Sequence, residues 1–248
     1  MIALSTRCSF SGTALKTIAC ITMLIDHIGA SCIEAGILTP GLDIGTLSRD
    51  TLSAYPLYQL DRVLRFTGRL AFPIFCFLLV EGFVHTHDVK KYVRRLFLFA
   101  LISEVPFDLA FFRTPFDPSA QNVYWTLVLG VLAMAGLKHF EKPDGSASWK
   151  GLLCAAGCTL AALLACTDYD GIGVLIICAL YLTRGDRKRQ CIVGAVLFAW
   201  ELTAPLAFVL VWFYNGQRGA CSPLHKKAFY WFYPVHLSVL AVVTNLLL

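Results

Sequence analysis

The chain has 248 residues, of which 57% are hydrophobic and 15% are charged. Roughly a quarter of the residues of an ordinary soluble domain are charged, so the composition excludes that class and indicates a protein that crosses a membrane several times. The formal net charge of +5 follows the loops between apolar segments and forms no separate basic domain. We therefore expect membrane lipid as a partner and no nucleic acid.

The first expected span covers about residues 15–35, where Lys16 anchors the start of a long apolar run. Asp26 and His27 interrupt this run near its middle. An ionisable side chain inside a membrane span is energetically expensive and usually has a function. This pair is therefore the first candidate for a functional site.

The long connection over residues 36–64 contains several Pro and Gly turn signals. A short helix is expected at its end, over about 58–68. Arg62, Arg65 and Arg69 recur at intervals of three and four residues, which places them on one face of that helix.

The next two spans, about 69–86 and 92–112, are joined by a turn that carries four cations. Because basic loops are retained on the cytoplasmic side of a membrane, we expect this turn at the inner surface. Three acids lie inside the apolar parts of these two spans and need an explanation: Glu81, Glu104 and Asp108.

The run 191–213 is ambiguous, since about 20 residues suffice to cross a membrane once but Glu201 and Pro205 interrupt its centre. It forms either one tilted span or a broken hairpin. The other apolar segments of this part of the chain cover about 122–138, 151–167, 171–183 and 228–247.

The distribution of Lys and Arg favours the broken hairpin. With nine segments and a cytoplasmic N-terminus, 16 of the 21 cations lie on the inner side. One span over 191–213 would move three more cations to the outer side. The predicted fold is therefore an all-α polytopic membrane helical bundle, a single domain over 1–248 with about nine membrane segments.

Ten cysteines resemble a disulfide framework, but most of them fall within or at the ends of apolar runs. We interpret them as small buried apolar residues. Cys154 and Cys158 are one helical turn apart, which is the wrong spacing for a CxxC redox or zinc pair. We therefore expect no metal site.

Four ionisable residues lie nine to eleven positions from a basic inner anchor: His27, Glu81, Glu104 and His236. At 1.5 Å per residue they are about 14–17 Å deep, near the middle of a hydrocarbon core roughly 30 Å thick. We expect His27 to meet one of the other three across a helix interface. It is not expected to pair with Asp26, because adjacent helical residues do not face each other.

Three interpretations of this layer remain open. Each group can be satisfied by a neighbour and serve only helix packing. A histidine beside a carboxylate can act as a general base, and the same groups can carry protons in a coupled transporter. The candidate catalytic residues are Asp26, His27, Glu81, Glu104 and His236.

Two basic stretches are assigned to the inner face: the cluster Lys90 to Arg95, and the loop 214–219 with Lys226 and Lys227 beside it. The glycines of the loop allow close backbone approach, and the cations suit phosphate groups. The alternative is that both stretches are ordinary signals of membrane topology.

Several stretches together resemble the TraX family of integral-membrane proteins, named for the acetylation of F-type pilin. They are LKTIACITMLIDHIG (15–29), GRLAFPIFCFLLVEGF (68–83), KYVRRLFLFALISEVPFDLAF (91–111), QNVYWTLVLG (121–130), DYDGIGVL (168–175), FYNGQRG (213–219) and FYWFYPVHL (229–237).

The resemblance implies an acyltransferase that takes an acetyl group from acetyl-CoA on the cytoplasmic side of a bacterial inner membrane. In the wider class of such enzymes a first-span histidine is the base, a role that falls on His27. The acyl-CoA phosphates would then be held by Arg94, Arg95, Asn215, Gly216, Arg218 and Lys226. The acceptor side would include Arg69, Asp108, Asn122 and Asp170.

The acceptor is left open by the sequence, and a pilin N-terminus, a sugar, a lipid and a small amine are all compatible with it. The rival hypothesis is a proton-coupled exporter that uses the same His and Glu layer. Such transporters are commonly built from internal repeats, and no convincing repeat relates the two halves of this chain. This favours the enzyme.

Overall fold

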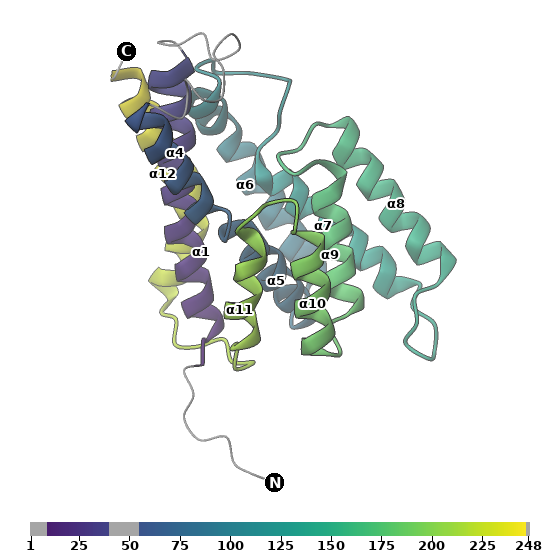
Figure 1. Ribbon diagram of the computed structural model, residues 1–248. Helices are drawn as coiled ribbons and strands as arrows, with labels where there is room; N and C mark the ends of the chain where they lie inside the picture. The colour runs from purple at the N-terminus through teal and green to yellow at the C-terminus, as the bar shows by residue number, and fades with distance from the viewer. Residues whose placement is uncertain (1–8, 40–54, 247–248) are drawn as a thin grey trace.

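The structure is a computed structural model, and it describes residues 9–39 and 55–246. Within these ranges the regular structure is helical, with two isolated bridges, Phe10 to Tyr214 and Gln121 to Thr167. The expected all-α architecture is confirmed. The elements (Figure 1) are α1 (Gly12–His27), η1 (Ile28–Leu38), α4 (Pro56–Gly68), α5 (Ala71–Val84), α6 (Val89–Phe111), α7 (Val123–His139), α8 (Trp149–Leu164), α9 (Asp170–Leu182), α10 (Arg187–Leu197), η2 (Ala204–Leu206), α11 (Ala207–Trp212) and α12 (Pro223–Leu246).

Three helical stretches are long and apolar enough to cross a membrane: Gly12–Leu38, Pro56–Val84 and Pro223–Leu246. Shorter apolar helices cover Val123–His139, Trp149–Leu164 and Asp170–Leu182. These lengths identify a membrane protein. The nine segments and the cytoplasmic N-terminus stay predictions.

Many large apolar side chains lie on the outside of the bundle, among them Leu164 and Leu202, which are each 75% exposed. In water such a surface would promote aggregation, whereas lipid tails are a favourable environment for it. The exposed apolar surface therefore supports the same conclusion as the helix lengths.

Several helices begin at a polar residue whose side chain accepts a hydrogen bond from the backbone of the first turn. Ser11 accepts from Ala14 N at 3.2 Å and so starts α1. In the same way Asp88, Asn122, Ser148 and Asp186 start α6, α7, α8 and α10. These caps fix where the helices enter the bundle.

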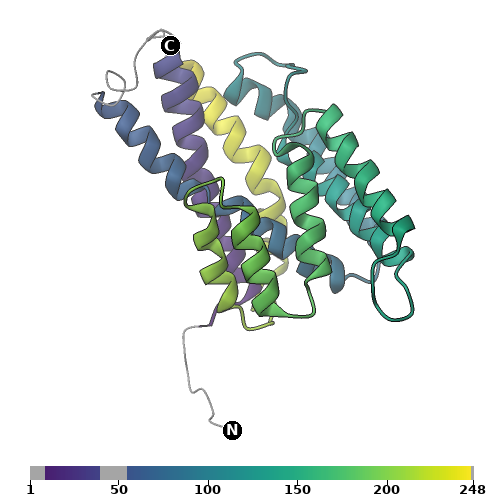
Figure 2. The same cartoon turned by 45° about the vertical axis from the view of Figure 1, so that its right-hand side comes forward.

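The run 191–213 is a broken hairpin, as the charge distribution predicts. Helix α10 ends at Leu197, the chain reverses, and η2 and α11 lead back beside α10 (Figure 2). The two helices pack tightly because Gly194 has no side chain: a Cβ there would collide with the ring of Phe208. Glycine at a helix contact allows this close approach.

Helix α1 continues directly into η1, a π-helix of 11 residues. It packs against α4, α5 and α12, while α12 in turn lies along α6. Helices α7, α8 and α9 form a second group of neighbours (Figures 1 and 2). Residues of both groups line the cavity described below.

Candidate functional site

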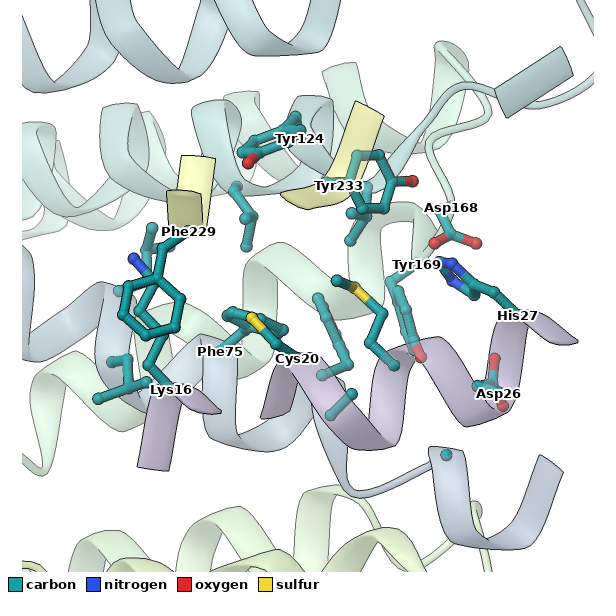
Figure 3. A pocket seen from close by; sticks show the side chains of 18 of the residues that line it. Lys16, Cys20, Asp26, His27, Phe75, Tyr124, Asp168, Tyr169, Phe229 and Tyr233 are labelled. Atoms are coloured by element: carbon teal, nitrogen blue, oxygen red, sulfur yellow. The ribbon is translucent and has the colours of Figure 1, made fainter. Parts of the chain in front are cut away.

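One cavity of about 1160 Å³ follows α1 and η1 from Gly12 to Ala35 and is also lined by α4, α5, α6, α9 and α12. Figure 3 shows Lys16 and Phe229 towards one end of it, and Asp26, His27, Asp168 and Tyr169 towards the other. Cys20, Met23 and Phe75 line the stretch between. The site therefore has two chemically different ends connected by a mainly apolar passage.

Four cations line the first end, which we call the basic end: Lys16, Arg95, Arg218 and Lys226. The ring of Tyr230 lies between two of them, with Lys16 Nζ 5.0 Å and the guanidinium carbon of Arg95 4.7 Å from its centroid. Such cation–π contacts fix the positions of the long side chains. None of the four cations makes an ion pair within the described residues.

The loop that carries Arg218 is attached firmly to the start of α1. Gly12 N donates to Gln217 O at 2.8 Å, and Thr13 donates to Arg218 O from both its backbone N (2.9 Å) and its hydroxyl (2.8 Å). Asn215 Oδ1 accepts from Gln217 N at 2.9 Å. This loop therefore presents its cation from a defined position.

The expected phosphate-binding set is only partly assembled at this end. Arg95, Gly216, Arg218 and Lys226 line the cavity, whereas Arg94 and Asn215 do not. Arg94 is exposed elsewhere on α6 because neighbouring helical residues point about 100° apart. Asn215 instead shapes the loop. The sequence interpretation assigned Lys16 only to membrane anchoring, although it also lines the cavity.

At the other end, which we call the histidine end, His27 meets His236. Their atoms Nδ1 and Nε2 are 2.7 Å apart, and the rings are stacked with centroids 5.0 Å apart. His236 Nδ1 is in turn 2.7 Å from Phe232 O. The expectation that His27 meets another member of the polar layer is confirmed for His236.

This chain of contacts determines the hydrogen positions on two neutral rings. A carbonyl oxygen can only accept, so His236 Nδ1 carries a hydrogen and its Nε2 has a lone pair. His27 Nδ1 must then donate to that lone pair, and the second nitrogen of His27, Nε2, is left unprotonated. Nε2 makes no hydrogen bond within the described part of the chain. His27 thus has the form of a free base at the cavity wall.

Aromatic side chains fix the orientation of the His27 ring. Phe111 and Tyr233 both contact it edge to face, with centroid distances of 5.3 and 6.0 Å. Both also line the cavity. The histidine pair is therefore held between rigid rings, which limits its rotation.

Two ion pairs flank the histidine pair. Arg65 Nη1 is 2.5 Å from Asp26 Oδ2, and Arg69 Nη1 is 3.0 Å from Glu201 Oε1. Helix α4 approaches closely here because Gly68 packs against Asp26 without a side chain of its own. Arg65 and Arg69 share the face predicted from their spacing, but Arg62 instead lies over the ring of Phe66.

The predicted position of Glu81 at mid-depth is wrong. Helix α5 ends at Val84, so Glu81 lies in its last turn rather than nine residues inside a span. It pairs with Arg187 at 3.6 Å. Gly68 packs against Asp26 at the histidine end of the cavity. Glu81 follows Gly68 by 13 residues, which corresponds to about 20 Å of helix length away from that end. The prediction counted residues from the basic turn as if the helix ran unbroken to it, but α5 ends at Val84 and leaves Glu81 close to the end of the helix.

Glu104 also fails to join the histidines, because it faces α7. It accepts hydrogen bonds from Asn122 and from Trp125 Nε1, the latter at 2.9 Å. Asn122 is buried and also donates to Ala100 O at 2.8 Å, while its Oδ1 accepts from Tyr124 N. Neither Glu104 nor Asn122 lines the cavity, and the pair joins α6 to α7.

Two more acceptor-side candidates differ in their positions. Asp108 is buried away from the cavity, where it accepts a hydrogen bond from Asp117 N at 3.0 Å. Asp170 does line the cavity, together with Arg69. Of the four acceptor-side candidates, Arg69 and Asp170 therefore line the cavity and Asp108 and Asn122 do not, while their role in acceptor binding stays a prediction.

Four residues of the histidine end had no predicted role: Arg65, Asp168, Tyr169 and Glu201. Asp168 and Tyr169 belong to the acidic, aromatic segment DYDG, from which the sequence analysis singled out only Asp170. Its composition was a signal, because a turn between apolar helices needs no such cluster. No group of His, Cys, Asp or Glu residues in 9–39 and 55–246 is arranged to hold a metal ion.

These features define a helical membrane protein with a long two-ended cavity and a histidine pair in its wall. Comparison with known families makes the assignment specific: the chain matches the TraX protein family over residues 11–244 and belongs to it. It is also similar to a probable fimbrial assembly protein FimC, serogroup H1, from Dichelobacter nodosus. The identity is 29% over 264 residues, covering 96% of this chain and 97% of that protein. No solved structure matches it.

Proposed function

We propose that this protein is a membrane acyltransferase that moves an acetyl group from acetyl-CoA to an amine or hydroxyl acceptor. The observation that carries the proposal is the hydrogen-bond chain from Phe232 through His236 to His27, which leaves His27 Nε2 free at the cavity wall. A positioned base of this kind typically accelerates such a step by about 10²- to 10⁴-fold.

The basic end is suited to the phosphates of the donor. Lys16, Arg95, Arg218 and Lys226 supply four positive charges, and none of them has an acidic partner in the part of the chain that the structure describes. Arginine binds phosphate through paired, charge-assisted hydrogen bonds, and lysine acts as a point charge. Tyr230, held between Lys16 and Arg95, keeps these charges in place.

The distance between the two ends matches the length of the donor. Lys16 and His27 are eleven residues apart on one helix, which corresponds to about 16 Å. A pantetheine arm has about 13 bonds from phosphorus to sulfur and extends to about 15 Å, at the length per bond of an extended chain. Cys20 and Met23 line the passage that this arm would follow. Phosphates at the basic end thus bring the thioester to His27.

In the reaction the acceptor enters from the histidine end and its N–H or O–H faces His27 Nε2. His27 takes this proton while the acceptor atom bonds to the thioester carbon. The C–S bond then breaks, and the thiolate of CoA receives the proton from His27. His236 accepts a hydrogen bond from His27 Nδ1 throughout, so it stabilises the transient imidazolium.

The acceptor and the location follow from the relative and from the charge distribution. The relative's name refers to fimbrial assembly, so a fimbrial subunit N-terminus is one candidate acceptor beside a sugar, a lipid or a small amine. The protein would lie in the bacterial cytoplasmic membrane with its N-terminus inside. Single-cysteine labelling should then find Gly145 and Gln217 on the inner side, and Thr46, which lies outside the described residues, on the outer side.

The direct test uses the purified full chain in lipid nanodiscs. Mass spectrometry should detect bound CoA, and radiolabelled acetyl-CoA should release free thiol faster when an amine acceptor is added. Absence of both CoA binding and acetyl transfer would overturn the proposal. A proton flux in sealed liposomes, without acetyl transfer, would instead favour the exporter.

A further inference from the structure

Asp168 has an unusual position among the charged residues of the histidine end. It lies in the reversal between α8 and α9 and lines the cavity at the same end as His27 (Figure 3). Its carboxylate makes no hydrogen bond or ion pair within the described residues, whereas Asp26 and Glu201 each pair with an arginine. Asp168 is thus an acid without an internal partner beside the proposed base.

The backbone holds Asp168 in a fixed place. Asp168 N donates to Gln121 O at 2.8 Å, and Gln121 N donates to Cys166 O at 2.9 Å. Cys166 and Asp170 on either side have φ angles of 50° and 45°, the left-handed region that non-glycine residues rarely adopt. Backbone of this kind persists where the surrounding structure requires it, and it is concentrated at functional sites.

A second observation at the same end points to a missing ligand. Glu201 Oε2 and Asp26 Oδ1 are buried without a hydrogen-bond partner, and both residues line the cavity. Glu201 is only 6% exposed. Buried carboxylate oxygens are normally satisfied, so unpaired ones indicate a donor that the chain itself does not supply.

The charges of this end leave room for a cation rather than an anion. Arg65 and Arg69 are already neutralised by Asp26 and Glu201, so the charge of Asp168 is not balanced by a pair. The rings of Tyr169 and Tyr233 also line the cavity here. Aromatic faces and carboxylates together are a common environment for ammonium groups.

The geometry points to Asp168 as the residue that binds the ammonium group of a primary-amine acceptor against His27. The reaction step of this inference rests on the proposed function, whereas the binding of the ammonium group does not. An ammonium ion has no lone pair and cannot attack a thioester. One proton must pass to the Asp168 carboxylate, which converts a poorly solvated ion pair into a neutral pair. The free amine then forms the C–N bond as the C–S bond breaks, and its second proton goes through His27 to the CoA thiolate. Asp168 releases the first proton to water before the next turnover.

Binding can be measured without the donor. The full chain in nanodiscs is titrated with ethanolamine, which is a cation at neutral pH, and with ethylene glycol, which has a similar size and no charge. We expect ethanolamine to bind and ethylene glycol not to bind. Asp168→Asn should weaken ethanolamine binding by about tenfold or more, and Asp168→Glu should retain part of it.

Asp144→Asn is the matched control, because it removes the same charge from the loop before α8 and lies outside the cavity. It should bind ethanolamine like the wild type. Equal affinity of wild type and Asp168→Asn for ethanolamine, or no binding by the wild type, would overturn the assignment of Asp168. Since no acetyl-CoA is present, failure of the acyltransferase proposal would leave this result unaffected.

Discussion

Arginine residues at the two ends of the cavity have opposite environments. At the basic end Arg95 and Arg218 line the cavity without an acidic partner among residues 9–39 and 55–246, whereas Arg65 and Arg69 at the histidine end are each bound to a carboxylate. An unpaired cation can bind an external anion, and a paired one mainly holds helices together. The same residue type is therefore expected to serve ligand binding at one end and the framework of the site at the other.

The largest effect should follow from removing the base between the two ends. His27→Ala is expected to lower kcat for acetyl transfer by about a hundredfold or more, because within the described residues no other histidine lines the histidine end of the cavity. CoA binding should stay close to wild type. His139→Ala, an exposed histidine at the end of α7, is the control. Near wild-type turnover by His27→Ala would remove the base assignment.

A framework role for Arg65 predicts a loss of stability. Arg65→Ala leaves the Asp26 carboxylate without its cation and should lower the free energy of unfolding by about 3 kcal/mol, measured by denaturant titration in mixed micelles. Arg62→Ala on the same helix should cost much less, since its guanidinium lies over the ring of Phe66. Equal losses in the free energy of unfolding for the two variants would contradict the framework role of the ion-paired arginine Arg65.

A ligand-binding role predicts a different result for Arg95. Arg95→Ala should raise the apparent KM for acetyl-CoA by about tenfold with little change in kcat, as expected when binding is lost equally in the ground and transition states. The affinity should also depend less on salt. The adjacent Arg94→Ala removes the same charge outside the cavity. Equal KM values for both variants would mean that the basic end only reflects membrane topology.

The smallest effect is expected away from both ends. Asn122→Ala removes the cap of α7 and a hydrogen-bond donor to Glu104, and the loss of such a cap costs about 1 kcal/mol. Thermal unfolding should shift downwards by a few degrees. The KM for acetyl-CoA should not change, because Asn122 does not line the cavity. A strong increase in the KM for acetyl-CoA would instead indicate that Asn122 takes part in substrate binding.

Local sequence patterns predicted much of the fold and one central contact. Apolar runs gave the order of the helices, and the charge distribution gave the broken hairpin at Glu201. His27 and His236 could be matched because both lie near the middle of long helical stretches, Gly12–Leu38 and Pro223–Leu246. Glu81 was misplaced because the end of α5 at Val84 cannot be located from hydropathy alone. The role of Asp168 depends on long-range packing of its loop against Gln121, which no local pattern encodes.

The length of the cavity along α1 has a consequence for membrane voltage. A charge moved through the whole transmembrane potential changes in free energy by about 2.3 kcal/mol per 100 mV. In the proposed reaction the phosphates of CoA remain at the basic end, and the acetyl group at the tip of the uncharged arm is the part that reaches His27. Because that group is neutral, its passage along the cavity is independent of the electric field. Delivery of the acetyl group to this depth would therefore be the same in an energised and in a depolarised cell.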